Sequence, residues 1–107
     1  MRYLLSQGLR LVRRNYRVSR GPYRRGGEID LIFRDVDGTV VFVEVRSRAS
    51  ARCGGSAASV SRAKQDCLRY AASVFVARLP SPPPCRFDVV AIDGAQLAWL
   101  PAAFDAS

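Results

Sequence analysis

Charged side chains interrupt two otherwise apolar segments of this chain. Residues 42–48, FVEVRSR, place Glu44 between two valines and Arg46 two residues further on. Residues 28–34, EIDLIFR, carry Asp30 in a similar apolar setting. Because acids are almost never buried without a partner, either one face of these segments is solvated or the acids take part in binding or catalysis.

A hairpin is expected between the two segments. Both have the alternation of a strand, and the DVDG at residues 35–38 is a typical turn sequence. If its last two residues form the turn, Asp30 and Glu44 point to opposite faces of the sheet, because side chains alternate along a strand. If its last three residues form the loop, with the glycine in the left-handed bulge position, Asp30 lies directly opposite Glu44.

The sequence permits both registers, and we choose the second because it explains the charges together by also placing Glu28 opposite Arg46. Two carboxylates at cross-strand distance can hold Mg²⁺ or Mn²⁺ through oxygen and leave positions for water and phosphate. Such an ion lowers the pKa of its bound water and neutralises charge on a phosphodiester. The alternative is a solvated sheet edge with a structural ion pair between Glu28 and Arg46.

Lys64 is the only lysine in a chain that otherwise uses arginine. It falls in the first turns of an expected helix, at the edge of that helix's apolar stripe. One interpretation is an aliphatic stem packed on the surface with its ammonium in water. The other is a lysine that points at the carboxylate end of the sheet and contacts phosphate or the attacking water.

The chain has a high positive charge, with 17 basic residues against 9 acidic ones and a net charge of +8. Such a charge attracts polyanions, of which nucleic acid is the usual one, although a merely solvated basic surface is the alternative. Tyr16 and Tyr23 are available to stack on bases. The arginines expected to contact phosphates are Arg13, Arg14, Arg17, Arg20, Arg24 and Arg25.

The remaining segments predict one domain over residues 1–107, with the order α–β–β–β–α–β–β. The chain opens on the end of a helix closed by Gly8, followed by a strand at 9–18 and a basic, glycine-rich loop at 19–27. A long helix is expected from an N-cap at Ser59 to Leu79. Its apolar stripe comprises Val60, Ala63, Cys67, Ala71 and Val74. Two strands follow, at 86–92 and 95–100.

Composition excludes several classes of protein. No apolar run reaches the roughly 18 residues of a membrane span, so we expect a cytoplasmic protein without membrane contact. Histidine is absent, which makes a zinc site uncommon. The three cysteines have unrelated spacings and are expected to be reduced.

The motifs together resemble a known family. GGEIDLIFRD at 26–35, VFVEVRSR at 41–48, a helix with an early lysine and RFDVVAI at 86–92 are similar to the bacterial YraN-like proteins. Those resemble the PD-(D/E)xK nuclease superfamily and archaeal Holliday-junction resolvases. The resemblance covers most of the chain and implies a restriction-endonuclease-like α/β fold, a mixed sheet flanked by helices.

The resemblance also implies a site. Asp30 falls on the metal-binding Asp of the motif and Glu44 on its second acid, and the backbone carbonyl of Val45 would be a further ligand. Arg46 stands where the motif has lysine, and a guanidinium cannot exchange a proton with water although it still stabilises an anion. Relatives usually carry a Glu on the first helix, upstream of the segment at Tyr3, so the N-terminal helix is expected to be truncated here.

The resulting hypothesis is a metal-dependent endonuclease acting on DNA, with branched or single-stranded structures as candidate substrates. Asp30 and Glu44 would bind Mg²⁺ or Mn²⁺, Arg46 would stabilise the transition state, and Lys64 would contact phosphate or water; Glu28 is a candidate additional acid. The alternative is a nucleic-acid-binding module of the same fold without turnover. By analogy with resolvases a homodimer is considered, with the strand containing Trp99 as its contact.

Overall fold

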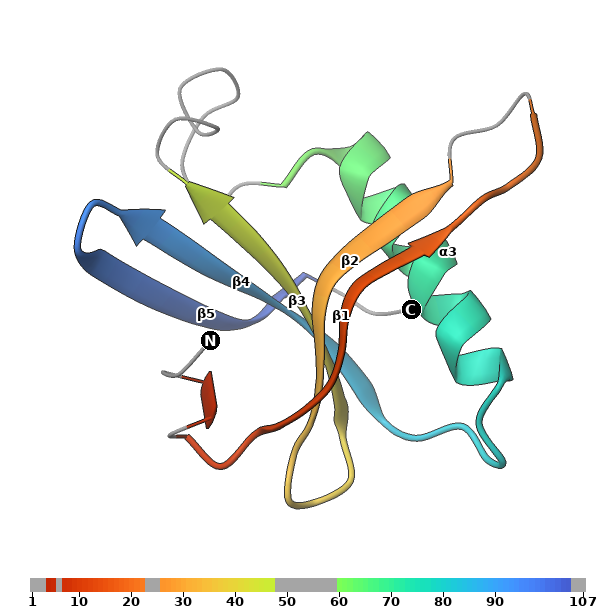
Figure 1. Ribbon diagram of the computed structural model, residues 1–107, viewed down its shortest axis with the longest axis horizontal. Coiled ribbons are helices and arrows are strands. Elements are labelled where there is room, and N and C mark those ends of the chain that lie inside the picture. The colour runs from red at the N-terminus through yellow and green to blue at the C-terminus, as the bar shows by residue number, and fades with distance from the viewer. Residues whose placement is uncertain (1–3, 6, 23–25, 48–59, 105–107) are drawn as a thin grey trace.

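The computed structural model describes residues 4–5, 7–22, 26–47 and 60–104, and Figure 1 shows a twisted sheet with a long helix across one face. Within these residues the strands run side by side in the order β1-β2-β3-β4-β5. Strands β3 and β4 are parallel and connected through α3, whereas the other neighbours are antiparallel. This confirms the predicted mixed α/β sheet. The elements are β1 (Arg10–Val18), β2 (Gly27–Arg34), β3 (Val40–Ser47), α3 (Arg62–Ala77), β4 (Cys85–Asp93) and β5 (Gln96–Phe104).

The described residues at the start of the chain agree with the predicted helix end. Leu4 and Leu5 are helical, and the backbone N–H of Gly8 donates to the carbonyl of Leu5. Gly8 has a φ of 89°, the left-handed conformation that glycine adopts when it ends a helix. The chain then turns directly into β1, which extends along β2.

Helix α3 begins later than the sequence suggested. Its N-cap is Ser61, whose hydroxyl oxygen accepts from the backbone N–H of Lys64 at 3.1 Å; Ser59, the predicted cap, lies outside the described residues. The predicted stripe is partly right, because Val60 and Ala71 are buried, but Ala63 is exposed and the helix also buries Leu68 and Ala72. Alanine and cysteine give little hydrophobic contrast between helix faces, so the sequence defined the buried face only approximately.

Apolar side chains form a core on each face of the sheet. On the face covered by α3, Phe42 of β3 and Phe87 of β4 pack with Leu68 and with Phe75 of the helix. On the other face, Phe33, Val41, Val43 and Val90 pack with two leucines of the N-terminal segment. Strand β3 is therefore buried on both faces, which explains its nearly continuous apolar sequence.

The ribbon formed by β1 and β2 is kinked in its middle. Gly27, Ile29 and Ile32 all lie against α3, although strict alternation would send residues 29 and 32 to opposite faces. The alternation therefore slips once, between Ile29 and Ile32. On β1 the kink coincides with Asn15, which has a left-handed φ of 48° and lies between the paired residues Arg14 and Tyr16. Figure 1 shows both strands bending together at mid-length.

The last two strands enclose a buried acid that has a structural explanation. Asp88 is fully buried, and its carboxylate accepts from Nε of Arg86, from Nε1 of Trp99 at 2.8 Å and from the backbone N–H of Ala102 at 2.9 Å. Trp99 is held to Asp88 within its own chain, and β5, the last strand of the sheet, is largely exposed, so the dimer contact through this strand stays a prediction. Among the described residues, no helix has the length and apolar character needed to cross a membrane.

Candidate metal centre

Strands β2 and β3 separate at the end of the sheet where the two acids lie. The paired residues run from Arg34↔Val40 to Leu31↔Val43, which confirms the three-residue loop and the register that we chose. Gly38 has a φ of 92°, as the bulge position requires. Beyond Leu31 and Val43 the strands diverge, as Figure 1 shows. We call the space between them, bordered by Asp30, Glu44 and Val45, the fork.

In the fork, the carboxylate of Asp30 accepts from the backbone N–H of Val45, which would otherwise pair with a carbonyl of β2. Its Oδ2 accepts from the backbone N–H of Val45 at 2.9 Å. In a strand, the N–H and C=O of one residue point to the same side, so the carbonyl of Val45 also faces the fork. The backbone of Val45 and the side chain of Asp30 therefore border the same space.

Glu44 is a buried acid beside another acid. The residue is 7% exposed. Its pKa is raised from 4.5 to about 7, mainly by burial and further by a hydrogen bond to Asp30 and repulsion from that carboxylate, whereas the ammonium of Lys64 lowers it. Its Oε2 lies 3.4 Å from Nζ of Lys64. Asp30 and Glu44 thus meet as the chosen register predicted, and near neutral pH Glu44 keeps part of its proton when no cation is bound.

Two buried polar atoms in this region have no hydrogen-bond partner, namely Oε2 of Glu44 and Nε of Arg46. The contact between Glu44 and Lys64 is an ion pair without the geometry of a hydrogen bond. A hollow of about 190 Å³ is lined by Glu44, Val45, Arg46 and Lys64. Because buried polar groups are normally paired, an acceptor and a donor left open at one hollow indicate that something else binds there.

The N-terminus of α3 brings Lys64 to the fork. The cap at Ser61 fixes Lys64 three residues into the helix. The first turn contains no acid but carries both Arg62 and Lys64. Cations near a helix N-terminus are opposed by the helix dipole, by about 0.3–1 kcal/mol each, so the placement of Lys64 is explained by its partner Glu44 rather than by helix stability.

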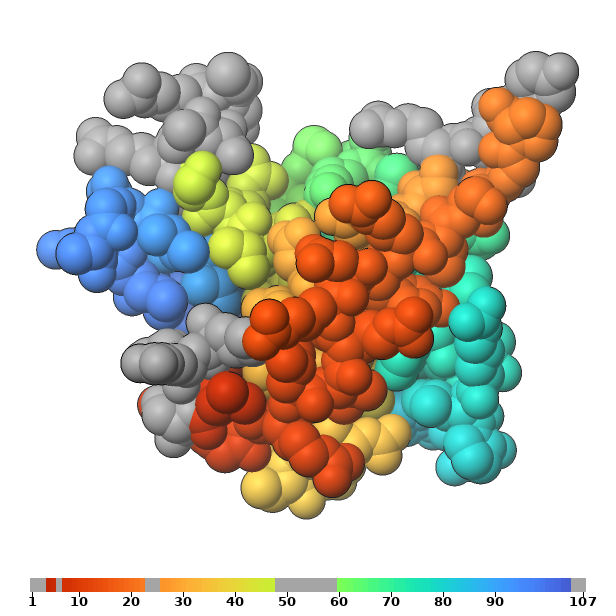
Figure 2. All heavy atoms as spheres, viewed as in Figure 1, coloured from red at the N-terminus to blue at the C-terminus, as the bar shows by residue number. Residues whose placement is uncertain are grey.

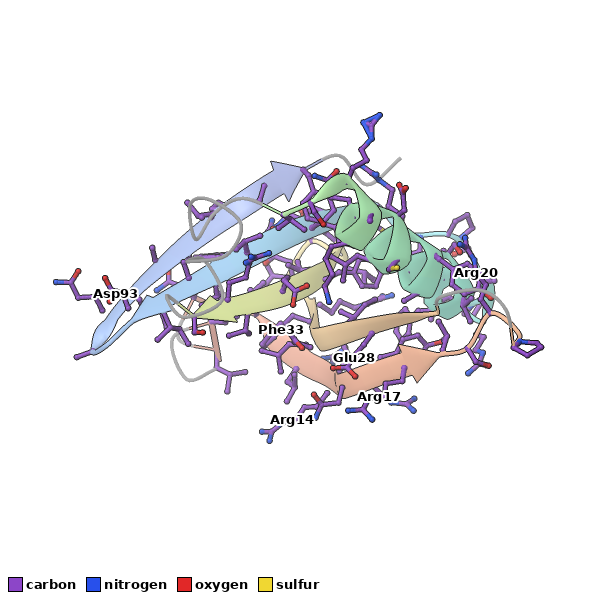
Figure 3. All side chains as sticks on the ribbon, turned by 90° about the horizontal axis from the view of Figure 1, so that it is seen from above. Arg14, Arg17, Arg20, Glu28, Phe33 and Asp93 are labelled. Atoms are coloured by element: carbon purple, nitrogen blue, oxygen red, sulfur yellow. The ribbon has the colours of Figure 1, made fainter. Side chains whose placement is uncertain are left out.

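Glu28 does not join this cluster. Its carboxylate pairs with Nε of Arg17 on β1, and the two residues are direct partners in the β1–β2 ladder. The expected pairing of Glu28 with Arg46 was wrong, because the kink at residues 30–31 turns Glu28 to the other face and the β2–β3 ladder has already ended. Figure 3 shows Glu28 beside Arg17.

The arginines predicted to bind nucleic acid do not form one uniform surface. Arg14 and Arg17 project from β1 away from α3, toward the face seen in Figure 2. The guanidinium of Arg13 lies 5.3 Å from the ring of Tyr16, and that of Arg20 lies 4.1 Å from the ring of Tyr70 on α3.

Tyr16 is 3% exposed and packs edge-on against Phe75, so the expectation that it stacks on bases was wrong. Alternation from Leu9 and Leu11 places Tyr16 on the opposite face of the strand, and Tyr16 is buried because α3 covers that face. Tyr23, Arg24 and Arg25 lie outside the described residues.

The residues of the fork fit a hard divalent cation. Asp30 and Glu44 supply carboxylate oxygens, the carbonyl of Val45 faces the same space, and Oε2 of Glu44 is open. Oxygen ligands of this kind suit Mg²⁺ and Mn²⁺, which retain several waters. The described residues hold no group of three or more His, Cys, Asp or Glu side chains suited to a metal, so the centre would rest on two acids and one carbonyl.

Two positions that the sequence analysis missed shape the fork. Asn15 allows the kink, since Asn tolerates the left-handed region better than other residues with a side chain. Gly27 allows α3 to approach β2, because a Cβ there would lie 2.2 Å from the carbonyl oxygen of Cys67. The consecutive glycines of RRGGE were a usable signal for such a close approach.

The structure defines an α/β protein with a mixed sheet and a two-carboxylate fork beside a helix N-terminus. Residues 1–92 match the family described as uncharacterised protein family UPF0102. The chain is 64% identical over 105 residues to a UPF0102 protein of Methylibium petroleiphilum, covering 98% of this chain and 86% of that protein. A UPF0102 protein of Paracidovorax citrulli is 58% identical over 104 residues, covering 97% of this chain and 75% of its own. The chain belongs to the UPF0102 family.

Proposed function

We propose that this protein is a metal-dependent endonuclease that acts on DNA, with branched or single-stranded structures as its substrates. The observation that carries the proposal is the meeting of Asp30 and Glu44 in the fork, with an open carboxylate oxygen beside Lys64 and Arg46. The order of these groups along the chain also resembles the motif of the PD-(D/E)xK nucleases.

Each residue has a role that follows from its chemistry. Asp30, Glu44 and the carbonyl of Val45 would hold Mg²⁺ or Mn²⁺. When bound, such an ion supplies Lewis-acid stabilisation of the phosphate and a more acidic water. Glu44 must lose its proton to act as a ligand, so its pKa of about 7 makes metal affinity rise with pH around neutrality.

In this proposal Arg46 and Lys64 together perform the two roles that the motif assigns to one lysine, namely charge stabilisation and contact with the attacking water. The open, buried Nε of Arg46 is a donor for a phosphate oxygen, and its fixed charge stabilises the negative charge that develops there. Lys64 lies 3.4 Å from Glu44 and has an amine that is able to exchange protons. Lys64 is therefore the candidate for orienting the attacking water as an ammonium, and for taking the proton of that water in its neutral amine form.

A second candidate function is nucleic-acid binding without turnover. The specific observation in its favour is the permanently charged Arg46 at the position where the motif has a lysine. In that case the fork would bind phosphate and metal without activating water. The two candidates share the surface and differ in the chemical step.

Cleavage of labelled junction and single-stranded DNA with Mg²⁺ or Mn²⁺ tests the enzyme. We expect slow metal-dependent cleavage by the wild type, none by Glu44→Ala, and a loss of about 10²–10⁴-fold for Lys64→Ala if its proton transfer is used. Arg46→Lys should increase the rate. Arg78→Gln, an exposed change at the far end of α3, is the matched control.

Absence of cleavage in the wild type and in Arg46→Lys, while both still bind DNA, would reject the enzyme and leave the binding module. Cleavage that survives Glu44→Ala would show that the fork is not the active site.

A further inference from the structure

Two arginines lie directly opposite each other at the hairpin end of the sheet, away from the fork. Arg10, the first residue of β1, pairs with Arg34, the last residue of β2. Directly opposite residues of an antiparallel pair lie on one face with Cβ atoms about 4.5–5.5 Å apart, and like charges in that position are destabilising. Within the described residues, no ion pair joins either arginine to a carboxylate.

The two residues border an open hollow of about 350 Å³. It is lined by Gly8, Arg10, Arg34, Asp35, Val36 and Gly38, and we call it the hairpin-end hollow. Both glycines have positive φ and no atom within 4 Å of where a Cβ would stand, so the space is not filled from their side. Figure 1 shows the start of β1 beside the β2–β3 hairpin at this end.

The one acid of the hollow is engaged elsewhere. Asp35 accepts from the backbone N–H of Val36 at 2.7 Å, and its Oδ2 lies 3.5 Å from Nη1 of Arg86 on β4. Its charge is thus shared with a third arginine rather than with Arg10 or Arg34. The hollow therefore retains a net positive charge.

We propose that the hairpin-end hollow binds a phosphate group, and that Arg10 and Arg34 hold it. A phosphate placed between the guanidinium groups relieves the repulsion between them and accepts from their paired N–H groups. Asp30 and Arg34 are four residues apart on β2, about 13 Å at the usual rise of a strand. The source of the phosphate is the backbone of a nucleic acid that also reaches the fork, an assignment that rests on the proposed function.

A titration with sodium pyrophosphate tests the site without nucleic acid. Amide NMR shifts should concentrate at the residues of the hairpin-end hollow, and Arg34→Gln should weaken binding by at least about tenfold. Arg78→Gln should bind as the wild type does. Arg10→Gln should also weaken binding but raise the melting temperature without ligand, because an exposed like charge is removed. Unchanged pyrophosphate affinity in both variants, or no binding by the wild type, would overturn the proposal.

A second arm identifies the source of the phosphate. For single-stranded DNA, the plot of log affinity against log salt concentration should be less steep in the double variant Arg10→Gln/Arg34→Gln. Its slope should be smaller in magnitude by about 0.7 to 1.4, at roughly 0.7 per lost phosphate contact. Its Mn²⁺ affinity should stay unchanged, since the fork is intact. Loss of pyrophosphate binding without a change in slope would overturn the nucleic-acid assignment and indicate a free phosphate compound. Failure of Mn²⁺ binding in the wild type would count against the proposed nuclease alone.

Discussion

At the scale of single residues, Glu44 has the most unusual environment in the described part of the chain. A carboxyl whose pKa rises from 4.5 in the unfolded chain to about 7 in the folded one binds its proton more tightly when folded. The folded state is therefore favoured most below pH 4.5, and this contribution is lost as the pH rises through about 7. One pKa unit corresponds to about 1.4 kcal/mol, so the loss amounts to about 3 kcal/mol.

Glu44→Gln should remove this penalty. Without added metal, we expect the free energy of unfolding at pH 8 to rise by up to about 3 kcal/mol, and that at pH 4 to change little. Chemical denaturation at the two pH values measures the difference. Glu28→Gln is the control, since that acid is half-exposed and paired with Arg17. The assigned environment would be contradicted if the difference in unfolding free energy between Glu44→Gln and the wild type were less favourable to the variant at pH 8 than at pH 4.

Asp88 shows why a buried acid need not be functional. It is more buried than Glu44, but three donors from Arg86, Trp99 and Ala102 satisfy its carboxylate. Glu44 keeps an open oxygen and repels a second acid. The difference between the two sites is whether the protein itself supplies the partners.

At the scale of the elements, the kink in the β1–β2 ribbon creates the fork. It ends the β2–β3 ladder at Leu31, turns Asp30 toward Val45 and sends Glu28 to the other face. The left-handed φ of Asn15 lies opposite this point. The kink is thus a local backbone feature whose consequence is the position of a carboxylate.

The variants Asn15→Gly and Asn15→Val test whether the left-handed φ at residue 15 is needed for stability and for Mn²⁺ binding. Glycine adopts a positive φ without strain, so Asn15→Gly should keep stability within about 0.5 kcal/mol and leave Mn²⁺ affinity unchanged. A β-branched side chain disfavours that conformation, and Asn15→Val should lose about 1–2 kcal/mol of stability and bind Mn²⁺ more weakly. Thermal unfolding and calorimetry measure the two quantities. Equal behaviour of the two variants would show that the kink does not depend on Asn15.

The sequence predicted those parts of the site whose geometry is determined by local sequence patterns. DVDG predicted a hairpin and permitted a three-residue loop with Gly38 in the bulge position, and the clustering of charges then selected the register that brings Asp30 to Glu44. The slip of alternation could not be foreseen, because Asn15 has no sequence pattern that distinguishes it from a strand residue. The error about Glu28 follows from that slip, whereas the error about Tyr16 arises because α3 covers the face on which it lies.

At the scale of the whole molecule, positive charge is spread over more than one face. Arg14 and Arg17 project from β1 opposite α3, whereas Lys64 and Arg46 line the fork. Part of this charge is already compensated within the chain, as the pair of Arg17 with Glu28 shows. The count of 17 basic residues therefore overstates the number of cations available to phosphates.

Binding to DNA should weaken steeply with salt, with a log–log slope of about −0.9 for each phosphate contact on a duplex. Because Glu28 already pairs with Arg17, we expect Arg17→Gln to change the slope by less than one contact. Fluorescence anisotropy at several salt concentrations measures both values. A flat response in the wild type would rule out binding through phosphates.

The central claim is that Asp30 and Glu44 hold a divalent cation in the fork, and calorimetric titration with Mn²⁺ tests it most directly. At pH 8 we predict one Mn²⁺ per chain, with affinity falling by about tenfold per pH unit below pH 7 as Glu44 takes up its proton. Asp30→Asn and Glu44→Gln should each abolish binding, and Glu28→Gln should not. Failure of the wild type to bind Mn²⁺ at pH 8, or binding that persists in both variants, would contradict the claim.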